Sequence, residues 1–220
     1  MYEFKRLSQV FESAKQITFD DSSRIVLMSD CHRGDGSWAD DFSKNQYLYF
    51  AALTYYYDEN YTYIELGDGD ELWENKKLSD IMREHSDVFR LMSRFIKAGR
   101  FLVRHIWRPL ELLGANDPTS AAKNYKKKVA IEKKLIEWVK RKNQMLIAGH
   151  THRPVFPEIN EPHYFNDGSC VHPRCITGIE IADGCITFVK WSVKAKKDGT
   201  LFVGRDVLER PNKLKDYFTT

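Results

Sequence analysis

The chain has 220 residues, of which 42% are apolar and 30% charged, and its formal net charge at pH 7 is +3. This length suits one sizeable domain with a single core and is slightly short for two. No apolar run approaches the length of a membrane span, and so small a net charge is no argument for nucleic-acid binding. We therefore expect one globular domain over 1–220.

The N-terminal residues and the cysteines both favour a cytoplasmic protein. Residues 1–15 carry charge throughout and lack the apolar centre and small-residue cleavage site of a secretory signal. The four cysteines form neither a CxxC pair nor an evident disulfide ladder, which suits a reducing compartment. We expect a cytoplasmic localisation on these two grounds.

The first hundred residues predict an alternation of helices and strands. Apolar spacing of three and four indicates helices, and short apolar runs between polar clusters indicate buried strands. We expect, in chain order, a helix, a strand, a helix, a strand and a long amphipathic helix over 4–15, 24–28, 43–57, 62–66 and 78–96. Such alternation favours a mainly parallel sheet covered by helices, with ligands bound beyond the carboxyl ends of its strands.

The middle of the chain is basic and more ambiguous. Residues 101–103 could form a third strand, and a helical basic insert is expected over about 104–143, with a long helix after Pro118. Its cationic residues are Lys123, Lys126, Lys127, Lys128, Lys133, Lys134, Lys140, Arg141 and Lys142. Such a run is usually a solvated helix face; the alternative is a surface for an anionic ligand or for peripheral contact with a membrane.

The C-terminal part changes to the alternation typical of strands. A fourth strand is expected over 145–148, and Asp183-Gly184 and Asp198-Gly199 each predict the turn of a hairpin. We expect these antiparallel hairpins to pack as a second sheet layer. The predicted fold class is α/β, or α+β in some schemes, with a parallel N-terminal half and antiparallel C-terminal hairpins.

Three of the expected strands end in residues that commonly bind metals. Asp30 and His32 follow the first strand, Asp68 follows the second, and His150 and His152 follow the strand over 145–148. Mixed nitrogen and oxygen donors suit Mn, Fe or Zn rather than a thiolate site, and a carboxylate such as Asp68 can bridge two cations. Each residue alone could equally belong to a turn or to the surface. Their shared position at strand ends favours a metal site.

These stretches resemble the motifs of the calcineurin-like metallophosphoesterases. The matches are DxH at Asp30 and His32, GDxxD/E at 67–71 and GHxH at 149–152. Trp73, the run 149–154 and Asn166-x-Gly168-Ser169 look most like the bacterial branch that includes UDP-2,3-diacylglucosamine pyrophosphatase. The resemblance implies a β-sandwich flanked by helices.

The same resemblance implies a two-metal centre. Asp30, His32 and His152 would bind one metal, His150 would bind the other, and Asp68 would bridge them. Two family motifs are missing, however: the Gly-Asn-His motif and a further Gly-His, which complete the second metal's ligands. His105 lies in this interval and is a candidate substitute acid or ligand. We hypothesise an internal deletion near Arg100.

The function expected from the resemblance is hydrolysis of a phosphate ester or pyrophosphate bond by metal-activated water, impaired by the loss of second-metal ligands. Mn is the expected metal, with Fe or Zn possible, and the substrate would be a phosphorylated small molecule or a lipid-linked one. Arg33 and Arg153 flank the ligand motifs and are candidates to contact phosphate, with ordinary surface arginines as the alternative.

Two other functions stay open. The chain could be a catalytically inactive relative that binds one metal, or a scaffold whose basic helix meets an anionic surface. Nucleic-acid binding through that helix is not expected, because it lacks interleaved aromatic residues and a known motif. The sequence predicts neither the physiological substrate nor the oligomeric state.

Overall fold

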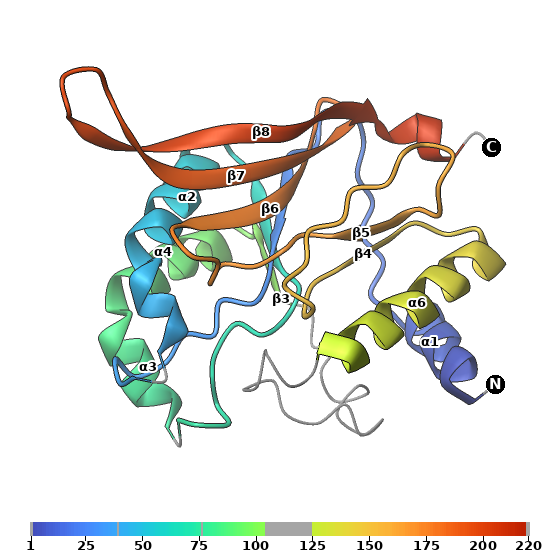
Figure 1. Ribbon diagram of the computed structural model, residues 1–220, viewed down its shortest axis with the longest axis horizontal. Helices are drawn as coiled ribbons and strands as arrows, with labels where there is room; N and C mark the ends of the chain where they lie inside the picture. Colours follow the sequence, from blue (N-terminus) through green and yellow to red (C-terminus); the bar gives the residue numbers. More distant parts are fainter. Residues whose placement is uncertain (1, 39, 76, 104–124, 219–220) are drawn as a thin grey trace.

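The computed structural model describes residues 2–38, 40–75, 77–103 and 125–218 (Figure 1). Within these residues, six strands form the main sheet: β1 (Ile25–Met28), β2 (Thr62–Glu65), β3 (Phe101–Val103), β6 (Cys175–Ala182), β7 (Cys185–Ala195) and β8 (Leu201–Lys213). Their order across the sheet is β3-β2-β1-β6-β7-β8. The sheet is mixed and flanked by helices, which confirms the predicted α/β class.

The N-terminal half of the sheet is parallel, as its sequence pattern predicts. β1 pairs with β2 (Val26 opposite Tyr63), and β2 pairs with β3 (Tyr63 opposite Phe101). The side chains of Val26 and Tyr63 are fully buried. Short apolar strands of this kind are typical of a sheet covered on both faces. Their carboxyl ends lie at one edge, where the predicted ligands follow.

The C-terminal hairpins form where predicted but do not make a second layer. Asp183 (φ 51°) and Gly184 (φ 68°) form the tight turn between β6 and β7, and Gly199 (φ 82°) lies in the turn before β8. β6 pairs antiparallel with β1, Leu27 opposite Ile179, so the hairpins extend the main sheet. The prediction that these strands form a second layer was wrong. The alternation of apolar and polar residues shows which face of a strand is buried, but not which other strand it pairs with.

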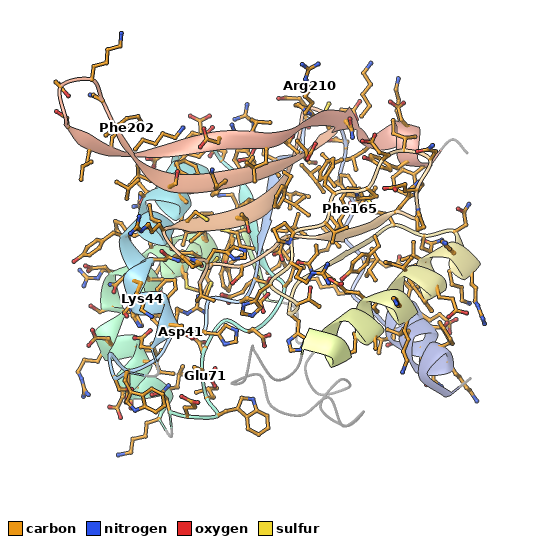
Figure 2. The ribbon with its side chains drawn as sticks, viewed as in Figure 1. Asp41, Lys44, Glu71, Phe165, Phe202 and Arg210 are labelled. Carbon is orange, nitrogen blue, oxygen red and sulfur yellow. The ribbon has the colours of Figure 1, made fainter. Side chains whose placement is uncertain are left out.

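A second, smaller layer is built by β4 (Leu146–Ala148) and β5 (Tyr164–Asn166), which pair in parallel. Phe165 of this layer, labelled in Figure 2, packs in one buried cluster with Leu27 and Ile179 of the main sheet. The sandwich implied by the resemblance is therefore present as six strands against two. β4 belongs to the small layer although its loop carries two of the predicted ligands.

One face of the main sheet is covered by α2 (Gln46–Asp58) and α4 (Ser86–Lys97), preceded by the short helices η1 (Asp41–Lys44) and α3 (Leu78–Glu84). The single helix expected over 78–96 is two helices that meet at His85. His85 is fully buried and its Nε2 lies 2.7 Å from Asp40 Oδ2. The apolar spacing continues through this junction, so periodicity alone does not reveal the break.

The outer side of the small layer is covered by α1 (Tyr2–Glu12) and α6 (Tyr125–Lys142), which lie side by side in Figure 1. Trp138 and Val139 of α6 form a buried cluster with Tyr164 of β5, against which Leu7 of α1 packs. The described part of the expected basic insert is therefore integral to the fold. Residues 104–124, which include His105 and Lys123, lie outside the described residues, as do the side chains of Lys126, Lys127 and Lys128.

The exposed face of α6 is basic, as predicted, with Lys133, Lys134 and Lys140 open to solvent. The last helix of the described residues is η2 (Leu214–Tyr217), whose Leu214 and Tyr217 pack in the buried cluster that joins the two layers. Along the described part of the chain, no helix is both long and apolar enough to cross a membrane.

Candidate metal centre

All five predicted ligands come together where β1, β2 and β4 end. The loops after β1 and β2 continue the parallel pairing, because Asp30 N donates to Gly67 O (3.0 Å) and His32 N donates to Asp68 O (2.9 Å). The loop after β4 joins them across the layers through a 2.7 Å hydrogen bond from His150 N to Asp30 Oδ2. The expectation that these strand ends converge is met in the structure.

The first group of potential ligands consists of Asp30, His32 and His152. One donor atom from each residue lies within 4.8 Å of the other two. Asp30 Oδ1 is 3.0 Å from His152 Nε2 and 3.8 Å from His32 Nε2, and the two Nε2 atoms are 3.3 Å apart. Asp30 Oδ1 is buried and, among the described residues, receives no well-aligned hydrogen bond. Two imidazoles and an unsatisfied carboxylate oxygen around one point fit a divalent cation such as Mn or Zn.

The second group consists of Asp30, Asp68 and His150, again with one donor atom each within 4.8 Å. His150 Nδ1 lies 2.9 Å from Asp68 Oδ2. Among the described residues, Asp30 is the one shared by the two groups, whereas the resemblance implies that Asp68 bridges. Whether Asp30 or Asp68 lies between two cations, its carboxylate offers one oxygen to each of them.

The backbone at all five ligands is left-handed. The φ values are 53° at Asp30, 48° at His32, 50° at Asp68, 71° at His150 and 56° at His152. Residues other than glycine rarely adopt this conformation, and it persists only where the surroundings hold it. Four other non-glycine residues of the described chain share it, Asn60, Asn143, Arg174 and Asp183. Strain concentrated on the predicted ligands independently indicates a functional site.

Gly149 makes the close approach of the third loop possible. A Cβ atom at this position would lie 2.1 Å from Ser29 Oγ and 2.7 Å from Asp30 Oδ2. Any side chain would therefore push the His150 loop away from Asp30. The glycine that begins the GHxH motif has a steric reason to be there.

The electrostatics of the group favour positive charge. Burial lowers the pKa of His32, but its contact with Asp30, its hydrogen bond with Glu71 and the charges of Asp30 and Asp68 outweigh burial and raise the pKa to about 10. Burial would raise the pKa of Asp30, but its contacts with His152 and His32 hold that pKa well below its usual range. Burial raises the pKa of Asp68. A cation at this point would compete with the His32 proton.

Several residues brace the ligands from behind. Glu71, labelled in Figure 2, has Oε2 3.0 Å from His32 Nδ1, an arrangement that aims Nε2 of His32 at the group. Ser29 Oγ hydrogen bonds with Asp30 Oδ2 and lies 2.7 Å from Asp167 Oδ1. Burial and the neighbouring charge of Asp30 raise the pKa of Asp167 well above its usual range.

The bracing residues Ser29 and Asp167 and the neighbouring His172 were not predicted as site residues. Burial and the nearby His152 lower the pKa of His172, whose buried Nε2 has no hydrogen-bond partner among the described residues. The only sequence signal for Asp167 is its place inside Asn166-x-Gly168-Ser169. The contact of Asp167 with Ser29 could not be predicted from the sequence, because it forms only where the end of β5 meets the end of β1.

The two candidate phosphate-binding arginines differ in position. Arg33 is fully buried, with Nη1 2.8 Å from Glu65 Oε1 and Nε donating to Asp70 Oδ1 at 2.7 Å. A guanidinium enclosed by two carboxylates cannot reach a phosphate, so we correct that expectation: Arg33 ties the loop after β1 to the loop after β2. Arg153 is different, because its side chain is 44% exposed beside His152.

No protein-family model matches the chain, and searches of the curated proteins and of the solved structures find no significant match. The resemblance to the metallophosphoesterases therefore rests on the motifs themselves. What the structure adds is geometric: residues from three separate stretches form two adjoining groups of potential metal ligands.

Proposed function

We propose that the chain binds a divalent transition-metal cation through Asp30, His32 and His152 and uses it to hydrolyse a phosphate ester or phosphoanhydride bond. The observation that carries the proposal is the convergence of these donor atoms, within 4.8 Å of one another, from two layers of the fold. Nitrogen and oxygen donors without a thiolate suit Mn, and also Fe or Zn.

A second cation would be held by Asp68 and His150, with Asp30 shared between the two. This group offers three donors, so the missing family motifs weaken a second site without removing its basis. When bound, such cations polarise a phosphoryl oxygen and lower the pKa of coordinated water. We expect the two groups to differ in affinity, because the first offers two imidazole donors and the second offers one.

The protein's own residues would orient the reaction. Glu71 and Ser29 fix the positions of His32 and Asp30, which limits the motion of the ligands. Arg153 is the described cation best placed to contact a phosphate oxygen, because it follows His152 directly and is partly exposed. Arg33 is not assigned this role.

The alternative is a protein that binds one cation without turnover. It is favoured by the different donor sets of the two groups, two imidazoles in the first and one in the second. Hydrolysis of phosphate esters by this kind of site uses two cations as a clamp. The alternative predicts about one metal ion per chain and no hydrolysis. Two ions per chain together with turnover would exclude it.

The test is hydrolysis of an aryl phosphodiester with added Mn²⁺, measured for the wild type, for His152→Ala and for the matched control His163→Ala. His163 precedes β5, at the end opposite Asn166, and its Nε2 lies 3.1 Å from Ile159 O. We expect Mn²⁺-dependent turnover in the wild type and in His163→Ala, and a loss of at least about 100-fold in His152→Ala. Equal rates in all three proteins would overturn the proposal.

A further inference from the structure

Thr151, the residue between the two histidines of the third loop, is anchored inside the fold. It is 5% exposed, and its Oγ1 donates to Glu132 Oε1 of α6 at 2.8 Å. Asn166 Nδ2 donates to Thr151 Oγ1 (3.1 Å) and to Gly149 O (3.0 Å). The loop that carries His150 and His152 is thus held by β5 on one side and by α6 on the other.

Glu132 is unusual among the charged residues of α6. It is 6% exposed, whereas Lys133, Lys134, Glu137 and Lys140 on the same helix are open to solvent. It occupies the apolar stripe of the helix, three and four residues before Leu135 and Ile136, which are partly buried and pack against the cluster of Trp138, Val139 and Tyr164. A buried carboxylate is unfavourable unless it is hydrogen bonded or paired, so a specific contact must account for its place.

Both oxygens of Glu132 contact the ligand loop. Oε1 accepts from Thr151, and Oε2 lies 3.3 Å from Nη1 of Arg153. The two contacted residues flank His152 on either side. One carboxylate of α6 therefore fixes the chain immediately before and immediately after a predicted ligand.

This loop needs such fixing because its backbone is strained. His150 (φ 71°) and His152 (φ 56°) are both left-handed, a conformation that histidine keeps only under external constraint. We propose that Glu132 is the positioning residue of the metal centre: through Thr151 and Arg153 it holds the loop in the conformation that aims both histidines inward. What the histidines then bind rests on the proposed function.

The test compares Glu132→Ala with Glu137→Ala, a matched change on the exposed face of the same helix. Glu137 pairs along the helix surface with Arg141, and 49% of its side chain is exposed. Hydrogen exchange of residues 149–153 in EDTA should become about 10-fold faster in Glu132→Ala and stay unchanged in Glu137→Ala. The Mn²⁺ affinity measured by calorimetry should fall roughly 10-fold in Glu132→Ala alone. Wild-type exchange and affinity in a folded Glu132→Ala protein would overturn the inference.

A second pair of variants covers the case in which Glu132→Ala does not fold. Thr151→Ser keeps the hydroxyl that reaches Glu132, and Thr151→Val removes it at nearly constant volume. We expect Thr151→Val to speed exchange of the loop and to weaken Mn²⁺ binding, and Thr151→Ser to restore both; identical behaviour of the two variants would contradict the anchor. A wild type that binds no Mn²⁺ would overturn the proposed function, whereas the exchange comparison in EDTA would still decide whether Glu132 holds the loop.

Discussion

Asp30 Oδ1 and His152 Nε2 lie 3.0 Å apart although Asp30 follows a strand of the main sheet and His152 follows a strand of the small layer. The contact depends on Gly149, which lets one loop pass directly over Ser29 and Asp30. It also depends on Glu132, whose carboxylate holds the residues on both sides of His152. The candidate metal centre thus forms only when the two layers are packed together.

Mn²⁺ should stabilise the folded chain through these ligands. At a concentration 100 times the dissociation constant, a cation that binds only the native state adds about 2.7 kcal/mol. For a chain of this size that corresponds to a rise in Tm of roughly 5–10 °C. Thermal unfolding with and without Mn²⁺ should show the rise in the wild type and in His163→Ala. The same rise in His152→Ala would place the cation elsewhere.

Replacing Gly149 by alanine should damage the centre sterically. The added Cβ would lie 2.1 Å from Ser29 Oγ, so the loop must move away from Asp30. We expect a loss of about 2 kcal/mol or more in the free energy of unfolding, together with loss of Mn²⁺ binding. Gly199→Ala is the control, because nothing lies within 4 Å of its Cβ and only the cost of its positive φ remains. Denaturant titration and calorimetry measure both effects; equal losses in the two variants would argue against the close approach.

Arg33 should contribute to stability rather than to substrate binding. Removing its charge in Arg33→Met leaves Glu65, which is 4% exposed, without its buried partner, and we expect a loss of about 3–5 kcal/mol. Arg83→Met removes an exposed pair with Asp80 and should cost about 0.5 kcal/mol or less. Urea titrations of both variants test the difference. A stable Arg33→Met protein with a raised KM would instead return Arg33 to the substrate site.

The metal-free protein should lose stability as the pH rises from neutral to alkaline. The pKa of His32 is raised from 6.5 to about 10, so its contribution is full below about pH 6.5 and disappears as the pH passes through 10. Because only 11% of the His32 side chain is exposed, the loss should reach a few kcal/mol. Unfolding in EDTA across pH 6–10 should therefore show a steeper decline for the wild type than for His32→Asn. Parallel declines would mean that His32 is not protonated in the folded state.

The local pattern of the sequence was enough to predict most strands and the loops that carry the candidate ligands. β1, β2 and β3 are short apolar runs bounded by polar or glycine residues, and each forms within a residue of its expected range. The loops that carry the candidate ligands are recognisable because Asp, His and Gly concentrate after β1, β2 and β4. Parallel pairing then brings the loops after β1 and β2 together without further information.

The rest depends on contacts between distant parts of the chain. Nothing local shows that β6 pairs with β1, or that the strand before His150 lies in another layer. From the sequence alone, Arg33 is expected at the surface, as arginines usually are. In the fold it is buried between Glu65 and Asp70. Glu132 interrupts an apolar stripe, which is a sequence signal, but its partner Thr151 is visible only in the fold.

The most direct test is a crystal structure of the Mn²⁺-soaked protein, with anomalous scattering recorded at the Mn edge. We predict an anomalous peak about 2.0–2.3 Å from Asp30 Oδ1, His32 Nε2 and His152 Nε2, and a second, weaker peak beside Asp68 and His150. The crystals are soaked in Mn²⁺ at more than millimolar concentration. No anomalous peak among Asp30, His32 and His152 in such crystals would contradict the metal centre.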